Sequence, residues 1–87
     1  MPGRYHVEVA RSAVKSMAKI PLPWQGRIRA AIDALETEPY YGQKMRGQYA
    51  AKRKIRVWPY RIIYSIEEDI KLVKVFEVEH RGQTSYD

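Results

Sequence analysis

The sequence predicts an α+β fold of two layers, in which a helical hairpin packs on one face of a mostly antiparallel sheet. Two observations predict it: apolar residues recur at helical spacing in the first half of the chain and alternate at strand spacing in the second half. The expected element order is β-α-α-β-β-β. The chain has 87 residues, which is enough for one small core, so we expect a single domain over residues 1–87.

The first half of the chain predicts one strand and two helices. Residues 4–9 alternate apolar and polar side chains, which is typical of a half-buried strand. Residues 11–19 carry one apolar stripe at helical spacing and predict a short helix. The prolines of segment 20–24 end this helix and begin a second one, which we expect to run as far as Pro39.

The second half of the chain predicts three strands. After a loop that contains glycines, residues 53–58 alternate between apolar and basic side chains. Residues 60–66 and 70–79 are rich in residues that favour strands. Pro59 marks a tight turn between the first two of these strands, so we expect the three to form an antiparallel meander.

The composition excludes several classes of protein. Hydrophobic residues make up 45% of the chain, which is too many for a disordered polybasic tail. Cysteine is absent, and this excludes disulfide bonds, thiolate zinc sites and cysteine nucleophiles. The first residues form no apolar signal segment, and no stretch approaches the roughly 18 apolar residues of a membrane span. We therefore expect a soluble, cytoplasmic protein with no membrane partner.

Basic residues are concentrated in one part of the chain. The formal net charge is +6, and residues 39–66 contain no Asp or Glu. This segment holds seven cations: Lys44, Arg46, Lys52, Arg53, Lys54, Arg56 and Arg61. Such a field favours a polyanionic partner, and the aromatic residues interleaved with the cations offer flat surfaces for unstacked bases. A solvated basic face with its aromatic residues in the core is the alternative.

One candidate site lies on the predicted hairpin. Lys54 and Arg56 share a face of their strand, and Arg61 follows the proline turn, so the three cations could meet and receive a phosphate group. Arg61 is not assigned to the core. Three solvated charges on an exposed sheet face are the alternative.

A second group lies at the C-terminal end of the last predicted strand and consists of His80, Arg81 and Tyr86. Scaffolds often display functional groups at such positions. An ordinary polar residue at a strand end is the alternative for His80, and a frayed or core-docked aromatic residue is the alternative for Tyr86. A metal site is not expected, since the chain has only two histidines and no recurring ligand spacing. No serine–histidine–aspartate or phosphate-binding glycine motif is present.

A set of basic and aromatic motifs covers nearly the whole chain in order. The motifs are Lys44-Met-Arg-Gly47, Lys54-Ile-Arg-Val-Trp-Pro-Tyr-Arg-Ile-Ile-Tyr64, Val78-Glu-His-Arg81 and Tyr86. This array resembles the RelE/ParE superfamily of type II toxin–antitoxin systems. The resemblance implies a ribosome-dependent mRNA endonuclease of the RelE type, which cleaves mRNA in the ribosomal A site, needs no metal or other cofactor, and is neutralised by a cognate antitoxin.

The resemblance also implies catalytic roles for five matched positions, which are Lys54, Arg56, Arg61, Arg81 and Tyr86. The 2′-hydroxyl of the RNA would attack the adjacent phosphate and leave a 2′,3′-cyclic phosphate and a free 5′-hydroxyl. Arg56 and Arg61 would stabilise the phosphorane. Lys54 would act as base, and Arg81 would assist the leaving oxygen, with His80 as the alternative acid.

Tyr86 would stack on a base or orient the nucleophile. The remaining cations of the basic segment would contact RNA or the ribosome: Lys44, Arg46, Lys52 and Arg53. Arg56 departs from the RelE pattern, in which lysine stands, and this is a tolerable change for a phosphate contact.

Two other functions stay open. A ParE-like toxin inhibits DNA gyrase and shares the fold without a full set of these groups. A noncatalytic RNA-binding or ribosome-binding module would bind without cleavage. The presence of all five matched positions favours the nuclease branch.

Overall fold

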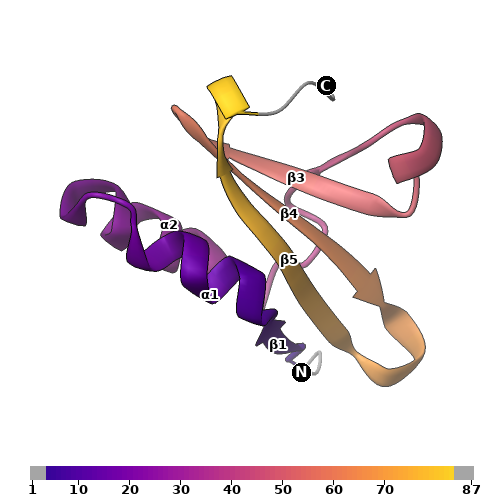
Figure 1. The fold of residues 1–87 in the computed structure, drawn as a ribbon. Helices are drawn as coiled ribbons and strands as arrows, with labels where there is room; N and C mark the ends of the chain where they lie inside the picture. The colour runs from indigo at the N-terminus through magenta and orange to yellow at the C-terminus, as the bar shows by residue number, and fades with distance from the viewer. Residues whose placement is uncertain (1–3, 84–87) are drawn as a thin grey trace.

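The computed structural model describes residues 4–83, and within that range it contains two α-helices and a five-stranded sheet (Figure 1). The elements are, in order, β1 (His6–Val9), α1 (Arg11–Ala18), α2 (Leu22–Ala34), β2 (Gln43–Lys44), β3 (Lys52–Val57), β4 (Tyr60–Glu67) and β5 (Leu72–His80). The strands lie in the order β1-β5-β4-β3-β2. Only β1 and β5 pair in parallel within the described sheet. The predicted α+β class and mostly antiparallel sheet are therefore confirmed.

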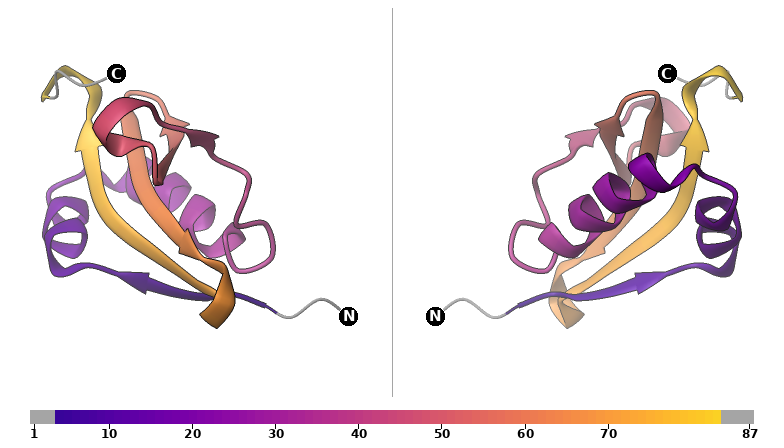
Figure 2. Two further views of the ribbon diagram at one scale, coloured as in Figure 1. Left: turned by 90° about the vertical axis from the view of Figure 1, so that its right-hand side faces the viewer. Right: turned by 90° about the vertical axis from the view of Figure 1, so that its left-hand side faces the viewer.

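The core lies between the helices and one face of the sheet. Ala13 of α1 and Ile28 of α2 are fully buried against the central strands. On β4, Ile62 and Tyr64 are two residues apart and so present the same face to the helices. Figure 2 shows α2 crossing this face, with α1 running beside β5. Neither helix of the described chain is long and apolar enough to cross a membrane.

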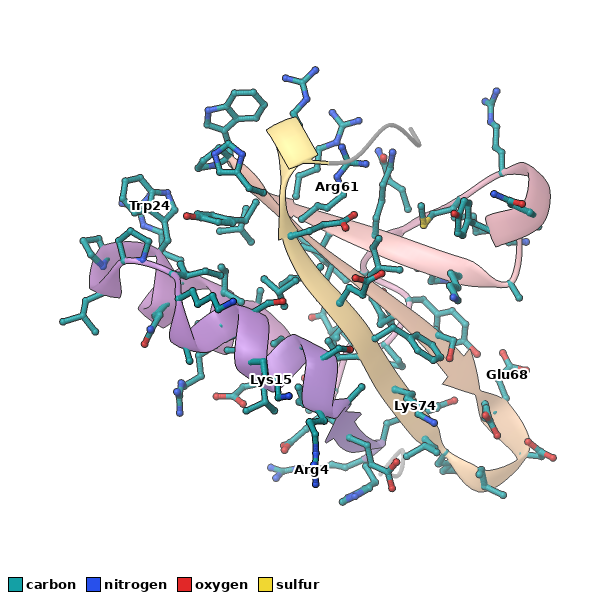
Figure 3. All side chains as sticks on the ribbon, in the orientation of Figure 1. Arg4, Lys15, Trp24, Arg61, Glu68 and Lys74 are labelled. Carbon is teal, nitrogen blue, oxygen red and sulfur yellow. The ribbon has the colours of Figure 1, made fainter. Side chains whose placement is uncertain are left out.

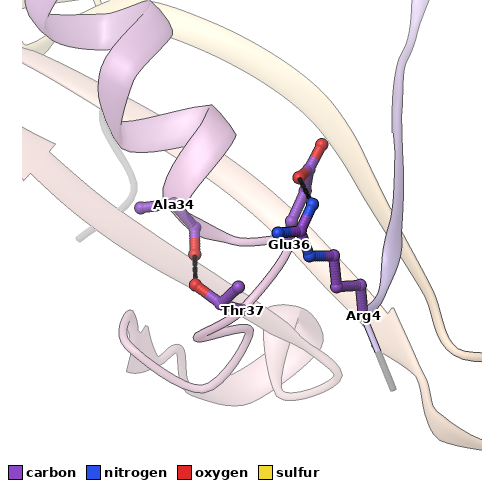
Figure 4. Close-up of polar contacts among 4 residues, drawn as sticks. All are labelled: Arg4, Ala34, Glu36 and Thr37. Carbon is purple, nitrogen blue, oxygen red and sulfur yellow. Dashed lines mark hydrogen bonds and ion pairs between the residues drawn. The ribbon is translucent and has the colours of Figure 1, made fainter. Parts of the chain in front are cut away.

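The second helix is shorter than the sequence predicts. It ends at Ala34 rather than near Pro39, and hydrogen-bonded turns follow. The Ala34 carbonyl accepts hydrogen bonds from the Thr37 hydroxyl (3.4 Å) and from the Thr37 backbone N–H (3.2 Å), as Figure 4 shows for the hydroxyl. A threonine side chain that competes for a helix carbonyl, close before a proline, favours a turn over another helical turn. Arg4 and Glu36 form an exposed ion pair at 3.9 Å beside this segment (Figure 4).

A short strand, β2, forms where the sequence predicts a loop. It pairs with β3 and begins directly after Gly42. The Gly42 N–H donates a hydrogen bond to the Tyr64 hydroxyl at 2.8 Å. A Cβ atom on Gly42 would lie only 2.6 Å from that hydroxyl oxygen, so the close approach requires glycine. A strand of two residues is too short to show alternation, which is why the sequence does not reveal it.

The turn between β3 and β4 is attached to two other elements. The Trp24 indole N–H of α2 donates to the Trp58 carbonyl at 3.1 Å. The Arg81 N–H, just past β5, donates to the Pro59 carbonyl at 2.8 Å. The rings of Trp24 and Tyr60 pack edge to face, with their centres 6.4 Å apart. These contacts bring residues from α2, from the turn and from the segment after β5 to one end of the sheet.

Candidate functional site

A row of charged residues crosses the sheet on the face opposite the helices. Arg56 of β3 lies directly opposite Arg61 of β4, and Arg61 lies directly opposite Glu79 of β5. Residues opposed in this way have their Cβ atoms about 4.5–5.5 Å apart. Arg61 therefore lies between a like charge on one side and an opposite charge on the other.

Arg61 is buried, with 4% of its surface exposed. As the sequence leads us to expect, Arg61 lies outside the hydrophobic core cluster, but the alternative of a solvated charge on an exposed sheet face is wrong for this residue. Its strand is the middle one of five, so neighbouring strands flank Arg61 on both sides. A buried guanidinium needs opposite charge or hydrogen-bond acceptors nearby. Glu79, whose Oε1 atom is also shielded from solvent, lies opposite Arg61 to supply that charge. Figure 3 shows Arg61 near the end of the sheet that Trp24 approaches from the helical side.

Three arginines line one small hollow at this end of the sheet. The hollow has a volume of about 100 Å³, and its lining consists of Arg56, Trp58, Tyr60, Arg61 and Arg81. The guanidinium carbon of Arg81 lies 4.8 Å from the centre of the Trp58 ring. Pockets for whole small molecules measure about 300–1,000 Å³. The size of this hollow and the three arginines in its lining therefore suit a small anionic group such as a phosphate.

Lys54 lies on the same face of β3 as Arg56 but lines a different hollow. That second hollow measures about 390 Å³, and its lining consists of Tyr41, Gly42, Gln43, Lys54, Ile55 and Arg56. Arg56 belongs to both linings and so stands between them. The structure thus brings Arg56, Arg61 and Arg81 together and places Lys54 beside them, on the far side of Arg56.

His80 and Glu79 are adjacent and so point to opposite faces of β5. The His80 Nδ1 atom accepts a hydrogen bond from the Gly82 N–H at 3.1 Å, and its ring meets the Tyr60 ring edge to face at 5.3 Å. His80 is not part of the lining of the arginine hollow. The predicted site residue Tyr86 lies outside the described residues.

The other predicted RNA-contacting cations lie away from the arginine hollow. Lys44 and Arg46 are exposed near the β2 edge of the sheet. The Lys52 ammonium lies 4.4 Å from the centre of the Phe76 ring. The Lys74 ammonium lies 5.6 Å from the same ring, so two cations flank one aromatic residue on the face opposite the helices.

Arg53 is held by the loop before β2. Its Nη1 atom donates to the Gly42 carbonyl at 2.6 Å and to the Tyr40 carbonyl at 3.3 Å. Tyr64 completes this cluster, because its hydroxyl donates to the Pro39 carbonyl at 2.8 Å and accepts from Gly42. Burial raises the pKa of the Tyr64 hydroxyl, and the Gly42 hydrogen bond and the Arg53 charge oppose that rise. Arg53 therefore supports the fold of this loop.

Sequence reasoning missed Glu79 and did not distinguish Trp58 from the other aromatic residues of the basic segment. Strand alternation alone could have grouped Glu77 with Glu79. It could not have shown that Glu79 lies opposite Arg61, because that pairing depends on the register between β4 and β5. The register shifts at an irregularity between Ile63 and Tyr64.

Known proteins resemble this chain in sequence and in fold. The family model described as the ParE toxin of the type II toxin–antitoxin system parDE matches residues 7–84. A chain of the RelBE2 toxin–antitoxin complex from Mycobacterium tuberculosis is 25% identical at a TM-score of 0.82, and the match covers 90% of this chain and 99% of that chain. A chain of the archaeal RelE–RelB complex from Pyrococcus horikoshii is 26% identical at a TM-score of 0.78, and the match covers 93% of this chain and 99% of that chain.

The YoeB/ParE toxin from Agrobacterium tumefaciens shares the fold at 13% identity and a TM-score of 0.74, with 86% of this chain and 96% of that chain covered. No curated protein matches this chain. Because the family model spans almost all of the described residues, the superfamily resemblance is confirmed. The chain belongs to the ParE toxin family, within the RelE/ParE superfamily of type II toxin–antitoxin systems.

Proposed function

We propose that this toxin is a ribosome-dependent endoribonuclease that cleaves mRNA in the ribosomal A site. The observation that carries the proposal is the convergence of Arg56, Arg61 and Arg81 on one hollow of about 100 Å³. Guanidinium groups present paired N–H donors that match phosphate oxygens. A hollow of this size and charge suits the scissile phosphate of an RNA strand.

In the proposed reaction the RNA supplies its own nucleophile. The 2′-hydroxyl oxygen attacks the adjacent phosphorus, and the bond from phosphorus to the 5′-oxygen breaks, which leaves a 2′,3′-cyclic phosphate and a 5′-hydroxyl. Negative charge grows on the phosphorane, and donors that are already oriented stabilise it most. Arg61 is the only buried residue of the three, so its side chain has the least freedom to move. Arg81, which follows β5, would stabilise the leaving oxygen.

Proton transfer is assigned to Lys54 as base, with His80 as the alternative acid to Arg81. Lys54 lines the hollow on the other side of Arg56, so the RNA would have to pass over Arg56 to bring its 2′-hydroxyl within reach. His80 is absent from the lining of the arginine hollow, so it could protonate the leaving 5′-oxygen only if the bound RNA brings that oxygen close to it. Much of the acceleration would then come from holding the RNA in line for attack. The ribosome would provide that alignment.

A cognate antitoxin is proposed as the partner that inactivates the toxin. The similar chain from M. tuberculosis is part of a toxin–antitoxin complex, and the similar chain from P. horikoshii is part of a RelE–RelB complex. The net charge of +6 would draw acidic residues of such a partner to the toxin.

Inhibition of DNA gyrase is the second candidate function, because the family model that matches is that of ParE. A toxin of this kind would act by binding a protein, and it would not need arginines grouped around a phosphate-sized hollow.

The decisive experiment compares both functions with one preparation of the toxin. We expect the toxin to cut mRNA on programmed ribosomes and to leave a 2′,3′-cyclic phosphate at the new end. Purified gyrase, assayed in parallel for supercoiling, is expected to stay active. Intact mRNA together with inhibited gyrase would show that the toxin is a gyrase inhibitor and not a nuclease. Ribosome binding with neither effect would indicate a noncatalytic module.

A further inference from the structure

Trp58 is an exposed tryptophan on a rigid support at the edge of the arginine hollow. Of its surface, 65% is exposed. Its own carbonyl is bound by the Trp24 side chain of α2, and the carbonyl of the following Pro59 is bound by the Arg81 N–H. The backbone of the turn is thus held from two sides while the ring projects into solvent. An exposed ring adds little to the core, so burial does not explain its presence.

The exposed ring of Trp58 already has one cationic neighbour. The Arg81 guanidinium lies 4.8 Å from the ring centre. One guanidinium can cover only one face of an indole, and the high exposure of the residue shows that much of the ring remains accessible. A flat aromatic ring next to an arginine is the arrangement on which single-stranded nucleic acids stack their bases.

The arginine hollow is large enough for the phosphate of a nucleotide but too small for its base. At about 100 Å³ it accepts a phosphate group, and the sugar and base of the same nucleotide must lie outside it. The lining contains two aromatic residues, Trp58 and Tyr60. Tyr60 is half-buried, and its ring already packs edge to face against Trp24 and His80. Trp58 is therefore the aromatic residue of the lining that can receive a base.

We propose that Trp58 is a stacking platform for one base of a single-stranded RNA whose neighbouring phosphate enters the arginine hollow. The choice of RNA rests on the proposed function. The observations favour a nucleotide over an acidic peptide, because a carboxylate side chain would use the arginines without covering the ring. Base stacking is tolerant of sequence, so this contact would hold the RNA without selecting a particular base.

The test compares two oligonucleotides that carry the same number of phosphates. One is a short 2′-O-methyl RNA, which lacks the nucleophile and cannot be cut; the other has the same backbone without bases. Binding to the toxin at low salt is measured by fluorescence anisotropy for the wild type, Trp58→Ala and Trp58→Phe. Tyr40→Ala is the matched control, because Tyr40 is also an exposed aromatic residue with an arginine over its ring, Arg53 at 5.1 Å, but lines a different hollow.

We expect Trp58→Ala to weaken binding of the base-containing strand by about 5- to 150-fold, the range of one lost stacking contact. Its affinity for the abasic strand is expected to change by less than about twofold, because the phosphate contacts remain. Trp58→Phe keeps an aromatic ring and is expected to retain most of the preference for bases. Tyr40→Ala is expected to keep the wild-type preference in full.

Two results would overturn the platform. One is a wild type with no preference for the base-containing strand. The other is an unchanged preference in Trp58→Ala, whether that variant binds both strands like the wild type or loses affinity for both equally. This test can fail independently of the proposed function. A toxin that prefers bases through Trp58 but never cuts mRNA on ribosomes would contradict the nuclease activity and leave the stacking platform supported.

Discussion

Arg61 of β4 lies directly opposite Glu79 of β5, and the pair lies beside a second arginine, Arg56 of β3. Arg61 is almost wholly removed from solvent, and one carboxylate oxygen of Glu79 is as well. Two guanidinium groups on neighbouring strands repel each other, and the Glu79 carboxylate offsets that repulsion. The Glu79 carboxylate thus stabilises the two arginines that would attract a phosphate, and it does so on the face of the sheet opposite the helices.

The first prediction concerns Glu79 and its neighbour on the same face of β5. Glu79→Gln keeps the shape of the side chain but removes the charge opposite Arg61, so we expect the free energy of unfolding to fall by about 1–3 kcal/mol. Glu77→Gln is the control, because Glu77 is exposed and lies opposite Ile63. We expect it to change stability by less than about 0.5 kcal/mol. Urea unfolding measures both, and equal effects would contradict the charge argument.

The second prediction separates Arg61 from Arg81. Arg81 is exposed, so Arg81→Ala is expected to lower mRNA cleavage by about 100- to 1,000-fold while the melting temperature stays unchanged. Arg61 is buried, so Arg61→Ala is expected to lower both cleavage and stability. Arg27→Ala, which removes an exposed cation from α2, controls for net charge. Full activity in Arg81→Ala at equal concentration would remove that residue from the site.

A third prediction concerns two glycines with opposite surroundings. A methyl group on Gly42 would meet the Tyr64 hydroxyl and the Lys54 carbonyl, at 2.6 and 2.8 Å. We expect Gly42→Ala to destabilise the fold by about 1–3 kcal/mol through this overpacking. Gly26 lies inside α2, and apart from its chain neighbours and the backbone of its own helix no atom of the described residues comes within 4 Å of the added position. Gly26→Ala is expected to stabilise the protein by about 0.5–1 kcal/mol. Thermal melts that rank the two variants in the other order would refute this account.

A fourth prediction follows from the raised pKa of Tyr64. Burial favours the protonated hydroxyl in the folded state, so its contribution to stability is complete below the ordinary pKa of about 10 and is lost as pH rises through the raised pKa. Tyr64→Phe removes this titration, and it also leaves Gly42 and Pro39 without their hydrogen-bond partner. We expect the variant to be less stable by about 1–3 kcal/mol at pH 8. That gap is expected to narrow above pH 10, as measured by urea unfolding; a constant gap would contradict the shift.

The sequence by itself determined the class of each long element, and for the two helices and the strand at residues 53–58 it also determined the buried face. Helical spacing through Ile28 and Ile32 and strand alternation around Ile55 are local patterns, and the structure places all three in the core. The same alternation put Arg56 on the opposite face of its strand from Ile55, where the structure has it. Such patterns can be read without knowledge of the partner strand, because side-chain direction depends only on the local backbone.

Only the tertiary structure decided which residues became neighbours across strands. The parallel pairing of β1 with β5 and the β4–β5 register join segments far apart in the chain, and no local pattern records them. That register, which includes a shift at Ile63 and Tyr64, placed Glu79 opposite Arg61. The burial of the Arg61 charge between neighbouring strands could therefore not be predicted from the sequence. The physical reason is that a strand slip of one residue reverses every side chain, so neighbours are set by pairing across the sheet and not by spacing along the chain.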